Sequence, residues 1–358
     1  MKATIVTYPD EFAQREIQEL AKAAGYSVEA IITQKRVVKS GYGVGVGKAQ
    51  ELSEMVAGND SDTLIIDESL TSSQANNLAK VTHAEVVDRE RLILNIFASR
   101  AATTEAKLQV QLAELRYEMP RARDFVRFSV RGERAGFSGM GETAVDVKFR
   151  ALKHRMVTIR QKLAQAESNR SIQRKERQKL EEPFVSFAGY TSSGKTTLFN
   201  RLASETKEES PNLFTTLTTT TRAITVPGSK RRVMLSDTVG FISRLPTYLV
   251  ESFKSTLEEL TYADLVLLVI DASENEDSIR IKFGSCKETL GQLRVDPKRV
   301  LLVLNKVDLI PDRIRAIASD RLFEGFSSIM TSATQGEGMR QLRNRIFELT
   351  REKDVREG

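Results

Sequence analysis

The residues with the clearest chemistry form a loop at positions 189–196, which reads Gly-Tyr-Thr-Ser-Ser-Gly-Lys-Thr. An apolar run precedes this phosphate loop, and a helix-like stretch begins near its lysine. Glycines let backbone N–H groups curve around a phosphate chain, the lysine supplies positive charge, and the threonine hydroxyl suits Mg²⁺. The loop predicts a nucleotide site made by Gly189, Tyr190, Thr191, Ser192, Ser193, Gly194, Lys195, Thr196 and Thr197, with Thr196 on the metal.

Three further polar segments each follow an apolar run that is typical of a buried strand. They are Asp237-Thr238-Val239-Gly240, Asn305-Lys306-Val307-Asp308 and Ser332-Ala333-Thr334. In an open parallel sheet, ligands bind in the crevice at the carboxyl ends of the strands. We therefore expect all four segments to converge on one nucleotide.

The carboxylate of Asp308, next to Asn305, indicates which base is bound. A carboxylate accepts hydrogen bonds from the ring N–H and the exocyclic amine of guanine, whereas adenine presents an acceptor at that ring position. Leaving the buried carboxylate unpaired costs several kcal/mol, so ATP should be rejected. The sequence predicts GTP as substrate and GDP as product.

A threonine-rich segment between the first helix and the next strand predicts a switch that orders around Mg²⁺ and the γ-phosphate. Thr216 is the chosen metal ligand, although six threonines crowd this segment and leave its register open. The predicted nucleotide contacts here are Phe214, Thr215, Thr216, Leu217 and Thr218. Asp237 would hold Mg²⁺ through a water, and the predicted catalytic residues are Lys195, Thr216 and Gly240.

Phe241 occupies the position where many switch GTPases have a glutamine that orients the attacking water. A phenylalanine side chain neither donates nor accepts a hydrogen bond. We therefore expect slow unassisted hydrolysis that a partner accelerates.

Composition narrows the class of protein. The chain has 358 residues, one cysteine and two histidines, so a disulfide scaffold, a zinc site and a histidine-based triad are all disfavoured. No signal peptide and no apolar run of bilayer length is recognised. We expect a soluble, cytoplasmic monomer.

The net charge of +6 is unevenly distributed. Residues 100–179 contain 19 Lys or Arg against 9 Asp or Glu, which favours a polyanionic partner over a merely solvated helical face. Five arginines between Pro120 and Gly141 alternate with phenylalanines and glycines, a pattern suited to phosphates and splayed bases. The predicted RNA contacts are Arg121, Arg123, Arg127, Arg131 and Arg134; the alternative is a loop whose charges are only solvated.

The periodicity of the chain predicts an α/β fold in three parts. Residues 1–97 alternate short strands and helices, as in a small parallel sheet domain, and residues 181–352 form a doubly wound nucleotide domain of the Ras-like type. Two apolar stripes, one on a helix from Arg89 to Tyr117 and one from Val145 to Ala166, predict an antiparallel helical hairpin over residues 98–180. Residues 353–358 form a polar tail.

A glycine-rich loop at positions 41–47 looks at first like a second nucleotide loop. It fits neither the phosphate-loop nor the dinucleotide pattern, since Tyr42 replaces the required glycine and Ala49 follows the lysine. A flexible or partner-facing loop is the favoured interpretation.

Taken over nearly its whole length, the chain resembles the HflX family of translation-associated GTPases, within the Obg-HflX superfamily. The resemblance rests on the nucleotide motifs, including Phe241, and more specifically on residues 67–78, 87–98 and 108–117. It implies an amino-terminal α/β domain, a helical hairpin and a GTP-binding domain that act on the large ribosomal subunit. It also implies that the hairpin tip contacts ribosomal RNA, and that such proteins separate idle or stalled ribosomes.

The chain differs from the family pattern at three places: the tip at residues 134–142, Ser192 in place of an asparagine, and Thr218-Thr219 in place of Asp-Pro. The alternatives to a ribosome-associated GTPase switch are an RNA-binding module in which nucleotide is only a stabilising ligand, and an ATP-dependent RNA remodeller. Asp308 speaks against the second alternative.

Overall fold

The computed structural model describes residues 1–35, 41–59, 61–132, 140–179, 182–203, 214, 220–225, 228, 231–310 and 321–351, with backbone alone at 123–132, 140–146, 148, 173–179 and 254–256. The chain divides into two compact units, Met1–Gln165 and Ala166–Gly358. Among helices in the described ranges, none combines the length and apolar character that a bilayer crossing requires.

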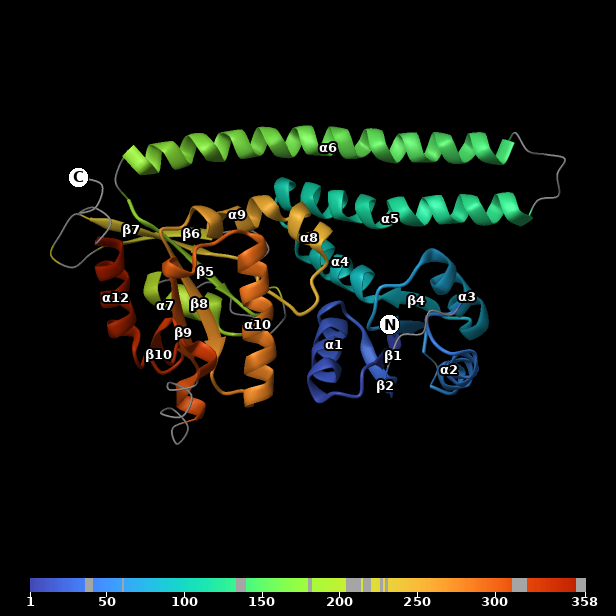
Figure 1. Cartoon of the computed structure of the whole chain (residues 1–358), viewed down its shortest axis with the longest axis horizontal. Coiled ribbons are helices and arrows are strands. Elements are labelled where there is room, and N and C mark those ends of the chain that lie inside the picture. Colours follow the sequence, from blue (N-terminus) through green and yellow to red (C-terminus); the bar gives the residue numbers. More distant parts are fainter. Residues whose placement is uncertain are drawn as a thin grey trace. The chain divides into compact units, whose positions relative to one another are not determined.

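The amino-terminal unit contains a parallel sheet in the order β2-β1-β3-β4 (Figure 1). Its strands are β1 (Lys2–Thr7), β2 (Ser27–Thr33), β3 (Thr63–Ile66) and β4 (Glu85–Asp88). Helices α1 (Glu11–Ala23) and α4 (Arg89–Arg100) pack on one face, and α2 (Val46–Gly58) and α3 (Ser72–Thr82) on the other. The predicted parallel sheet flanked by helices is confirmed.

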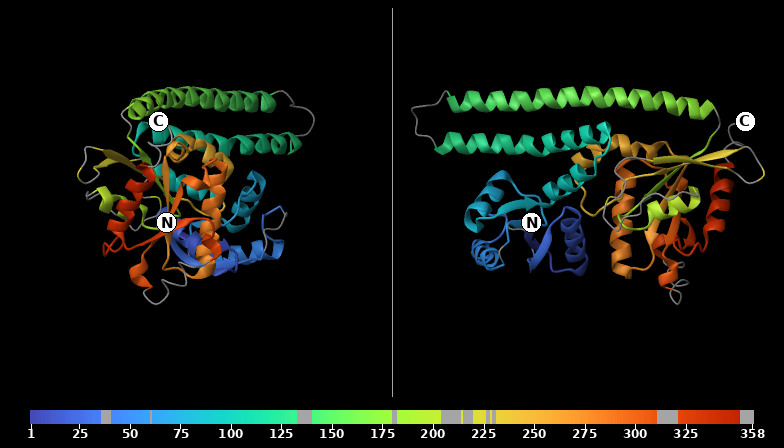
Figure 2. Two further views of the ribbon diagram at one scale, coloured as in Figure 1. Left: turned by 60° about the vertical axis from the view of Figure 1, so that its left-hand side comes forward. Right: turned by 180° about the vertical axis from the view of Figure 1, so that it is seen from behind.

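Two long helices, α5 (Thr104–Gly132) and α6 (Met140–Lys179), run side by side in opposite directions (Figures 1 and 2). Leu112 and Leu115 of α5 pack with Met156 and Ile159 of α6 in a buried cluster. These residues belong to the two predicted apolar stripes, so the stripes are core.

Two predicted boundaries in this region are wrong. The helix expected from Arg89 to Tyr117 is two helices, because Ala101 is extended and the Thr103 hydroxyl accepts a hydrogen bond from Ala106 N at 3.1 Å, which starts a new helix. The second of these helices also extends beyond the expected end at Tyr117, since α5 continues through Pro120 to Gly132. Proline removes one backbone hydrogen bond from the helix, and the neighbouring Met119 packs against the buried α5–α6 cluster.

The second unit is built on a six-stranded sheet in the order β10-β9-β8-β5-β7-β6, in which only β6 runs antiparallel to its neighbour. The strands are β5 (Phe184–Gly189), β6 (Thr220–Thr225), β7 (Arg232–Asp237), β8 (Leu265–Asp271), β9 (Val300–Asn305) and β10 (Ser327–Thr331). Hence five strands present their carboxyl ends at the same edge of the sheet.

Helices cover both faces of this sheet (Figures 1 and 2). Helices α7 (Lys195–Ala203) and α12 (Met339–Arg351) bury one face with Leu198, Phe199 and Ile346, while α9 (Lys254–Tyr262) and α10 (Glu276–Gln292) contact the other. The short helix α8 (Thr247–Ser252) packs against α9. This arrangement is the doubly wound fold that the alternating strand and helix patterns predict.

Candidate functional site

The phosphate loop connects β5 to α7, and its two glycines are required by its shape. Gly189 has φ +146° and Gly194 has φ +95°, values that side chains rarely permit. A β-carbon on Gly189 would lie 2.3 Å from Val269 O, and one on Gly194 would lie 2.2 Å from Asn305 Nδ2. The loop can therefore curl tightly against β8 and β9 only with glycine at both positions.

Lys195, the first residue of α7, is buried inside the curve of this loop. Its ammonium donates to Gly189 O at 3.0 Å and to Tyr190 O at 2.7 Å. Burial lowers the pKa of Lys195 to about 8, although the nearby charge of Asp237 opposes this shift. An anion placed against the loop would meet this buried ammonium.

The two described residues expected on the metal lie next to each other. Thr196 Oγ1 donates to Asp237 Oδ2 at 3.0 Å, and Asp237 is buried at the end of β7. A hydroxyl and a carboxylate are hard oxygen ligands of the kind that Mg²⁺ prefers, so these residues fit that ion. The third expected ligand, Thr216, lies outside the described residues, as do Thr215, Leu217 and Thr218.

The segment that follows β7 folds back onto the phosphate loop. Thr191 N donates to Phe241 O at 2.8 Å, and Phe241 N donates to Gly189 O at 3.0 Å. A β-carbon on Gly240 would lie only 2.8 Å from Thr191 Cγ2 and 3.1 Å from Lys195 Nζ. Gly240 thus packs directly against the lysine.

Thr238 and Val239 have side chains buried in the protein rather than exposed at the site. The Thr238 hydroxyl donates to Phe187 O at 2.5 Å, which attaches this segment to β5. Phe214, the one described residue among the five predicted nucleotide contacts 214–218, is also buried and has φ +57°.

Asn305 links three of the predicted segments. Its Nδ2 donates to Ser193 O at 2.9 Å, and its Oδ1 accepts from Ala333 N at 3.1 Å and from Thr331 Oγ1 at 3.3 Å. Asn305 is 1% exposed, so these hydrogen bonds are shielded from water. One amide therefore fixes the phosphate loop and the loop after β10 to the end of β9.

Asp308 lies in a short 3-10 helix, Val307–Leu309, just beyond Asn305. Its Oδ1 is buried and lacks a hydrogen-bond partner among the described residues. A buried carboxylate oxygen without a donor is costly, and a ligand that offers N–H groups would satisfy it. This geometry fits the ring N–H and amine of guanine.

Lys306, with φ +66°, turns the chain between Asn305 and Asp308. Its ammonium pairs with Asp271 Oδ2 at 2.5 Å, a contact that links the ends of β8 and β9. Our sequence reasoning missed Asp271, although its position directly after an apolar strand at the same sheet edge is the signal that also marks the other segments.

The loop after β10 is organised by its own side chains. Ser332 Oγ accepts from Gln335 N at 3.0 Å and lies 3.2 Å from Thr334 Oγ1, while Ser332 N donates to Glu337 O at 3.0 Å. This turn brings the backbone of Ala333 against Asn305.

Comparison with known proteins agrees with this geometry. Residues 11–98 match the family described as GTP-binding GTPase N-terminal, residues 100–177 match GTP-binding GTPase Middle Region, and residues 184–306 match 50S ribosome-binding GTPase. GTPase HflX of Thermococcus kodakarensis is 44% identical over 303 residues, which cover 85% of this chain and 68% of the relative. GTPase HflX of Hyperthermus butylicus is 35% identical over 97% of this chain and 96% of its own length.

The chain belongs to the GTPase HflX family. Family membership implies GTP hydrolysis and a P-loop GTPase domain. Among solved structures, a GTP-binding protein from Sulfolobus solfataricus in complex with GDP is 28% identical, covers 98% of this chain and 99% of its own, and gives a TM-score of 0.50. A second structure, a complex of SsGBP with GDP, is 27% identical over 98% of both chains with a TM-score of 0.54.

The arginines expected to contact RNA in this HflX chain are only partly described. Arg121 donates to Asp88 Oδ2 at 2.6 Å and to Leu70 O at 2.7 Å, and its guanidinium carbon lies 3.6 Å from the centre of the Tyr117 ring. The side chain of Arg121 is therefore engaged within its own unit. The side chains of Arg123, Arg127 and Arg131, and all of Arg134, lie outside the described residues.

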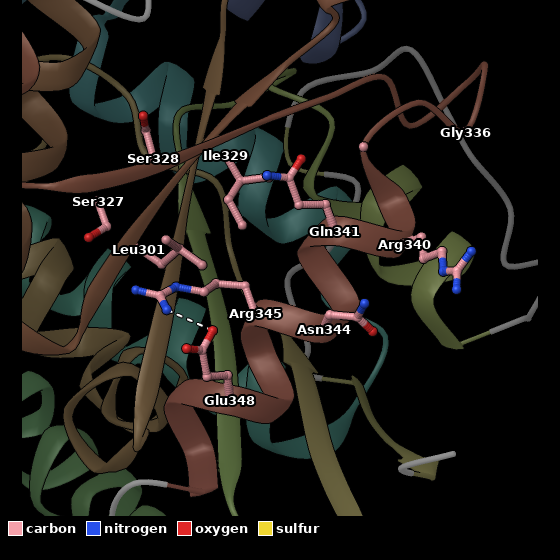
Figure 3. Close-up of a pocket in the computed structure, with 11 residues that line it drawn as sticks. Leu301, Ser327, Ser328, Ile329, Gly336, Arg340, Gln341, Asn344, Arg345 and Glu348 are labelled. Atoms are coloured by element: carbon pink, nitrogen blue, oxygen red, sulfur yellow. Dashed lines mark hydrogen bonds and ion pairs between the residues drawn. The ribbon is translucent and has the colours of Figure 1, made fainter. Parts of the chain in front are cut away.

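A hollow of 760 Å³ lies elsewhere in the GTPase domain, between β10 and α12 (Figure 3). None of its lining residues belongs to the predicted nucleotide segments. Arg345 within it is paired with Glu348 at 2.7 Å. The lining of this hollow therefore provides none of the predicted nucleotide contacts, and we assign the candidate site to the carboxyl ends of the strands.

Proposed function

We propose that this HflX-family chain binds GTP and GDP at the edge where β5, β7, β9 and β10 end. The observation that carries the proposal is the buried Oδ1 of Asp308, which has no hydrogen-bond partner within the described part of the chain. It follows Asn305, which binds the phosphate loop at the same sheet edge. In this proposal the base lies against Asn305, Asp308 and the Ser332–Thr334 loop, and the phosphates lie in the curve of residues 189–196.

We further propose that Thr196 and Asp237, together with Thr216, hold Mg²⁺ at the phosphates. Bound there, Mg²⁺ would neutralise charge on the outer phosphates. Lys195 supplies a fixed positive charge to the same region, and the backbone of Gly240 lies next to that charge. Phe241 cannot orient water, because its side chain is 1% exposed and apolar, so unassisted hydrolysis is slow and a partner accelerates it.

At the level of the whole chain, we propose three parts: residues 1–97, the hairpin at 98–180, and the GTPase domain at 181–352 with a short tail at 353–358. The nucleotide state controls binding of a monomer to the large ribosomal subunit, with an effect on subunit association or on stalled ribosomes. The family that matches residues 184–306 is described as 50S ribosome-binding GTPase, which supports this partner. The arginines beyond Arg121 are the proposed contacts with ribosomal RNA.

Calorimetric titration tests the nucleotide assignment. We expect GDP with Mg²⁺ to bind at least a hundredfold more tightly than ADP, because only guanine satisfies Asp308. Asp308→Asn should weaken GDP and favour xanthosine diphosphate, whose base carries an oxygen in place of the amine. Equal affinity of the unaltered chain for ADP and GDP would exclude the proposed base recognition.

A further inference from the structure

The turn that leads to Asp308 contains a strained residue. Lys306 has φ +66° and ψ +32°, a left-handed conformation that a residue with a β-carbon keeps only when its surroundings hold it there. The carbonyl of Lys306 accepts from Leu309 N at 3.1 Å and so begins the 3-10 helix in which Asp308 lies. Because Asp308 is two residues further on, a change in the backbone at Lys306 would redirect its carboxylate.

The side chain of Lys306 is held by a carboxylate from the neighbouring strand. Asp271, the last residue of β8, accepts from the Lys306 ammonium at 2.5 Å, and the two side chains are 10% and 33% exposed. Asp271 is itself fixed, because its Oδ1 accepts from Ser273 N at 3.0 Å and from Ser273 Oγ at 2.5 Å. The carboxylate of Asp271 is therefore a firm anchor for Lys306.

The ends of β8 and β9 are already joined through the main chain. Asp271 is the register partner of Asn305, and Ala272 N donates to Asn305 O at 2.9 Å. The pair between Asp271 and Lys306 thus adds little to the alignment of the two strands. Its specific effect falls on Lys306, whose left-handed conformation it stabilises.

We propose that Asp271 is a positioning residue for guanine recognition. By holding Lys306, it stabilises the turn that directs Asp308 Oδ1 towards the base. The proposal rests on the guanine-nucleotide binding proposed above. Asp271 acts through Lys306 and not by contact with the nucleotide.

Asp271→Asn tests this proposal, because it retains the oxygen that accepts from Ser273 and removes the charge that holds Lys306. GDP and inosine diphosphate carry the same phosphates, but only guanine has the exocyclic amine that donates to Asp308. In titration calorimetry, the affinity ratio of GDP to inosine diphosphate should fall by roughly three- to tenfold, as expected when one hydrogen bond is weakened. The altered charge near the phosphates affects both ligands alike and cancels in the ratio. An unchanged ratio would overturn the proposal.

Two substitutions of Lys306 separate the turn from the ion pair. Both Lys306→Ala and Lys306→Gly remove the ammonium, but glycine adopts the left-handed conformation without strain, whereas alanine does not. Lys306→Ala should lower the affinity ratio about as much as Asp271→Asn does, and Lys306→Gly should lower it less. Equal losses in the alanine and glycine variants would show that Asp271 does not act through the turn, and would overturn the proposal.

Glu274→Gln is the matched control. Glu274 pairs with Lys282 of α10 in the same domain, and the two side chains are 25% and 20% exposed. This variant removes one carboxylate charge from a half-buried pair outside residues 305–308, so the affinity ratio should not change. A fall equal to that of Asp271→Asn would contradict the proposed path through Lys306.

Hydrogen exchange in the nucleotide-free chain tests the turn independently of any ligand. Asp271→Asn should make exchange in the peptide that contains Leu309 roughly three- to tenfold faster, since the Leu309 N–H is protected by the Lys306 carbonyl. If the unaltered chain binds neither diphosphate, the proposed function fails. Unchanged exchange would then also exclude the hold of Asp271 on the turn, whereas faster exchange would confirm that hold.

Discussion

At the scale of single residues, the chemistry of the site depends on Lys195, which is buried in the ligand-free structure. The pKa of Lys195 is lowered from 10.5 to about 8, mainly by burial, so its charged form is less stable in the folded chain than in the unfolded chain. The burial of charged Lys195 lowers the free energy of unfolding by its full amount below pH 8, and this effect disappears as the pH rises to 10.5. The contribution of Lys195 to the free energy of unfolding should therefore rise with pH across that interval. Bound anionic phosphates would raise the pKa of Lys195 again and so keep its ammonium charged.

The first prediction follows from that shift. Binding of GDP should take up a proton near pH 8.5, and affinity should fall by up to about tenfold per pH unit above 8, since phosphate binds the protonated lysine. Titration calorimetry in two buffers of different ionisation enthalpy measures the proton uptake. Measurements at pH 7, where Lys195 is already charged, serve as the reference. A flat affinity between pH 7 and 9, without proton uptake, contradicts the prediction.

The residues that gather at the sheet edge could be predicted because each follows an apolar strand and carries a recognisable motif. Pair contacts between distant positions could not be predicted. The contact between Lys306 and Asp271, and that between Tyr190 and Ser243, depend on the strand order and on where α10 packs, which no local pattern specifies. Likewise Arg121, selected from sequence as an RNA contact, pairs with Asp88 because the path of α5 brings it there.

At the scale of elements, one carboxylate joins the hairpin to the amino-terminal sheet. Asp88 begins α4 by accepting from Arg91 N at 2.8 Å, and it also accepts from Tyr117 Oη at 3.0 Å and from Arg121 at 2.6 Å. Burial, together with the charge of Asp88, raises the pKa of the Tyr117 phenol, so it stays a donor. Leu70 N donates to the same carboxylate at 3.1 Å.

The second prediction compares two aspartates that both cap helices. Asp88→Asn should lower the free energy of unfolding of the amino-terminal unit by about 2–4 kcal/mol, because an amide nitrogen cannot accept at this buried position and the half-buried Arg121 loses its countercharge. In calorimetric scans of the whole chain, the melting transition of this unit should fall by roughly 5–10 °C.

The control is Asp10→Asn, where the side chain caps α1 through Ala13 N alone at 2.8 Å in the contacts described. Asparagine caps helices as well as aspartate does, so the change should stay within about 0.5 kcal/mol. Equal shifts for the two variants would show that Asp88 only caps its helix.

Helix boundaries show the limit of local reasoning at this scale. Apolar periodicity correctly predicted that the stripes on α5 and α6 pack together. The same periodicity ran through the break at Ala101, and the predicted end at Tyr117 was too early, since α5 continues to Gly132.

At the scale of the whole molecule, positive charge is concentrated in residues 100–179. The third prediction is that Arg127→Gln combined with Arg131→Gln weakens binding to ribosomal RNA and reduces the salt slope of log affinity by about one per arginine removed. The matched control, Arg280→Gln with Arg340→Gln, removes the same charge at exposed positions of the GTPase domain and should leave the slope unchanged. Equal slopes in both double variants would place the RNA contact elsewhere.

The central claim is that nucleotide state controls association with the ribosome, and co-sedimentation with purified large ribosomal subunits tests it most directly. We expect the chain to sediment with the subunit in the presence of a non-hydrolysable GTP analogue and to remain largely unbound with GDP or without nucleotide. The same amount of sedimented protein under all three conditions would contradict the account.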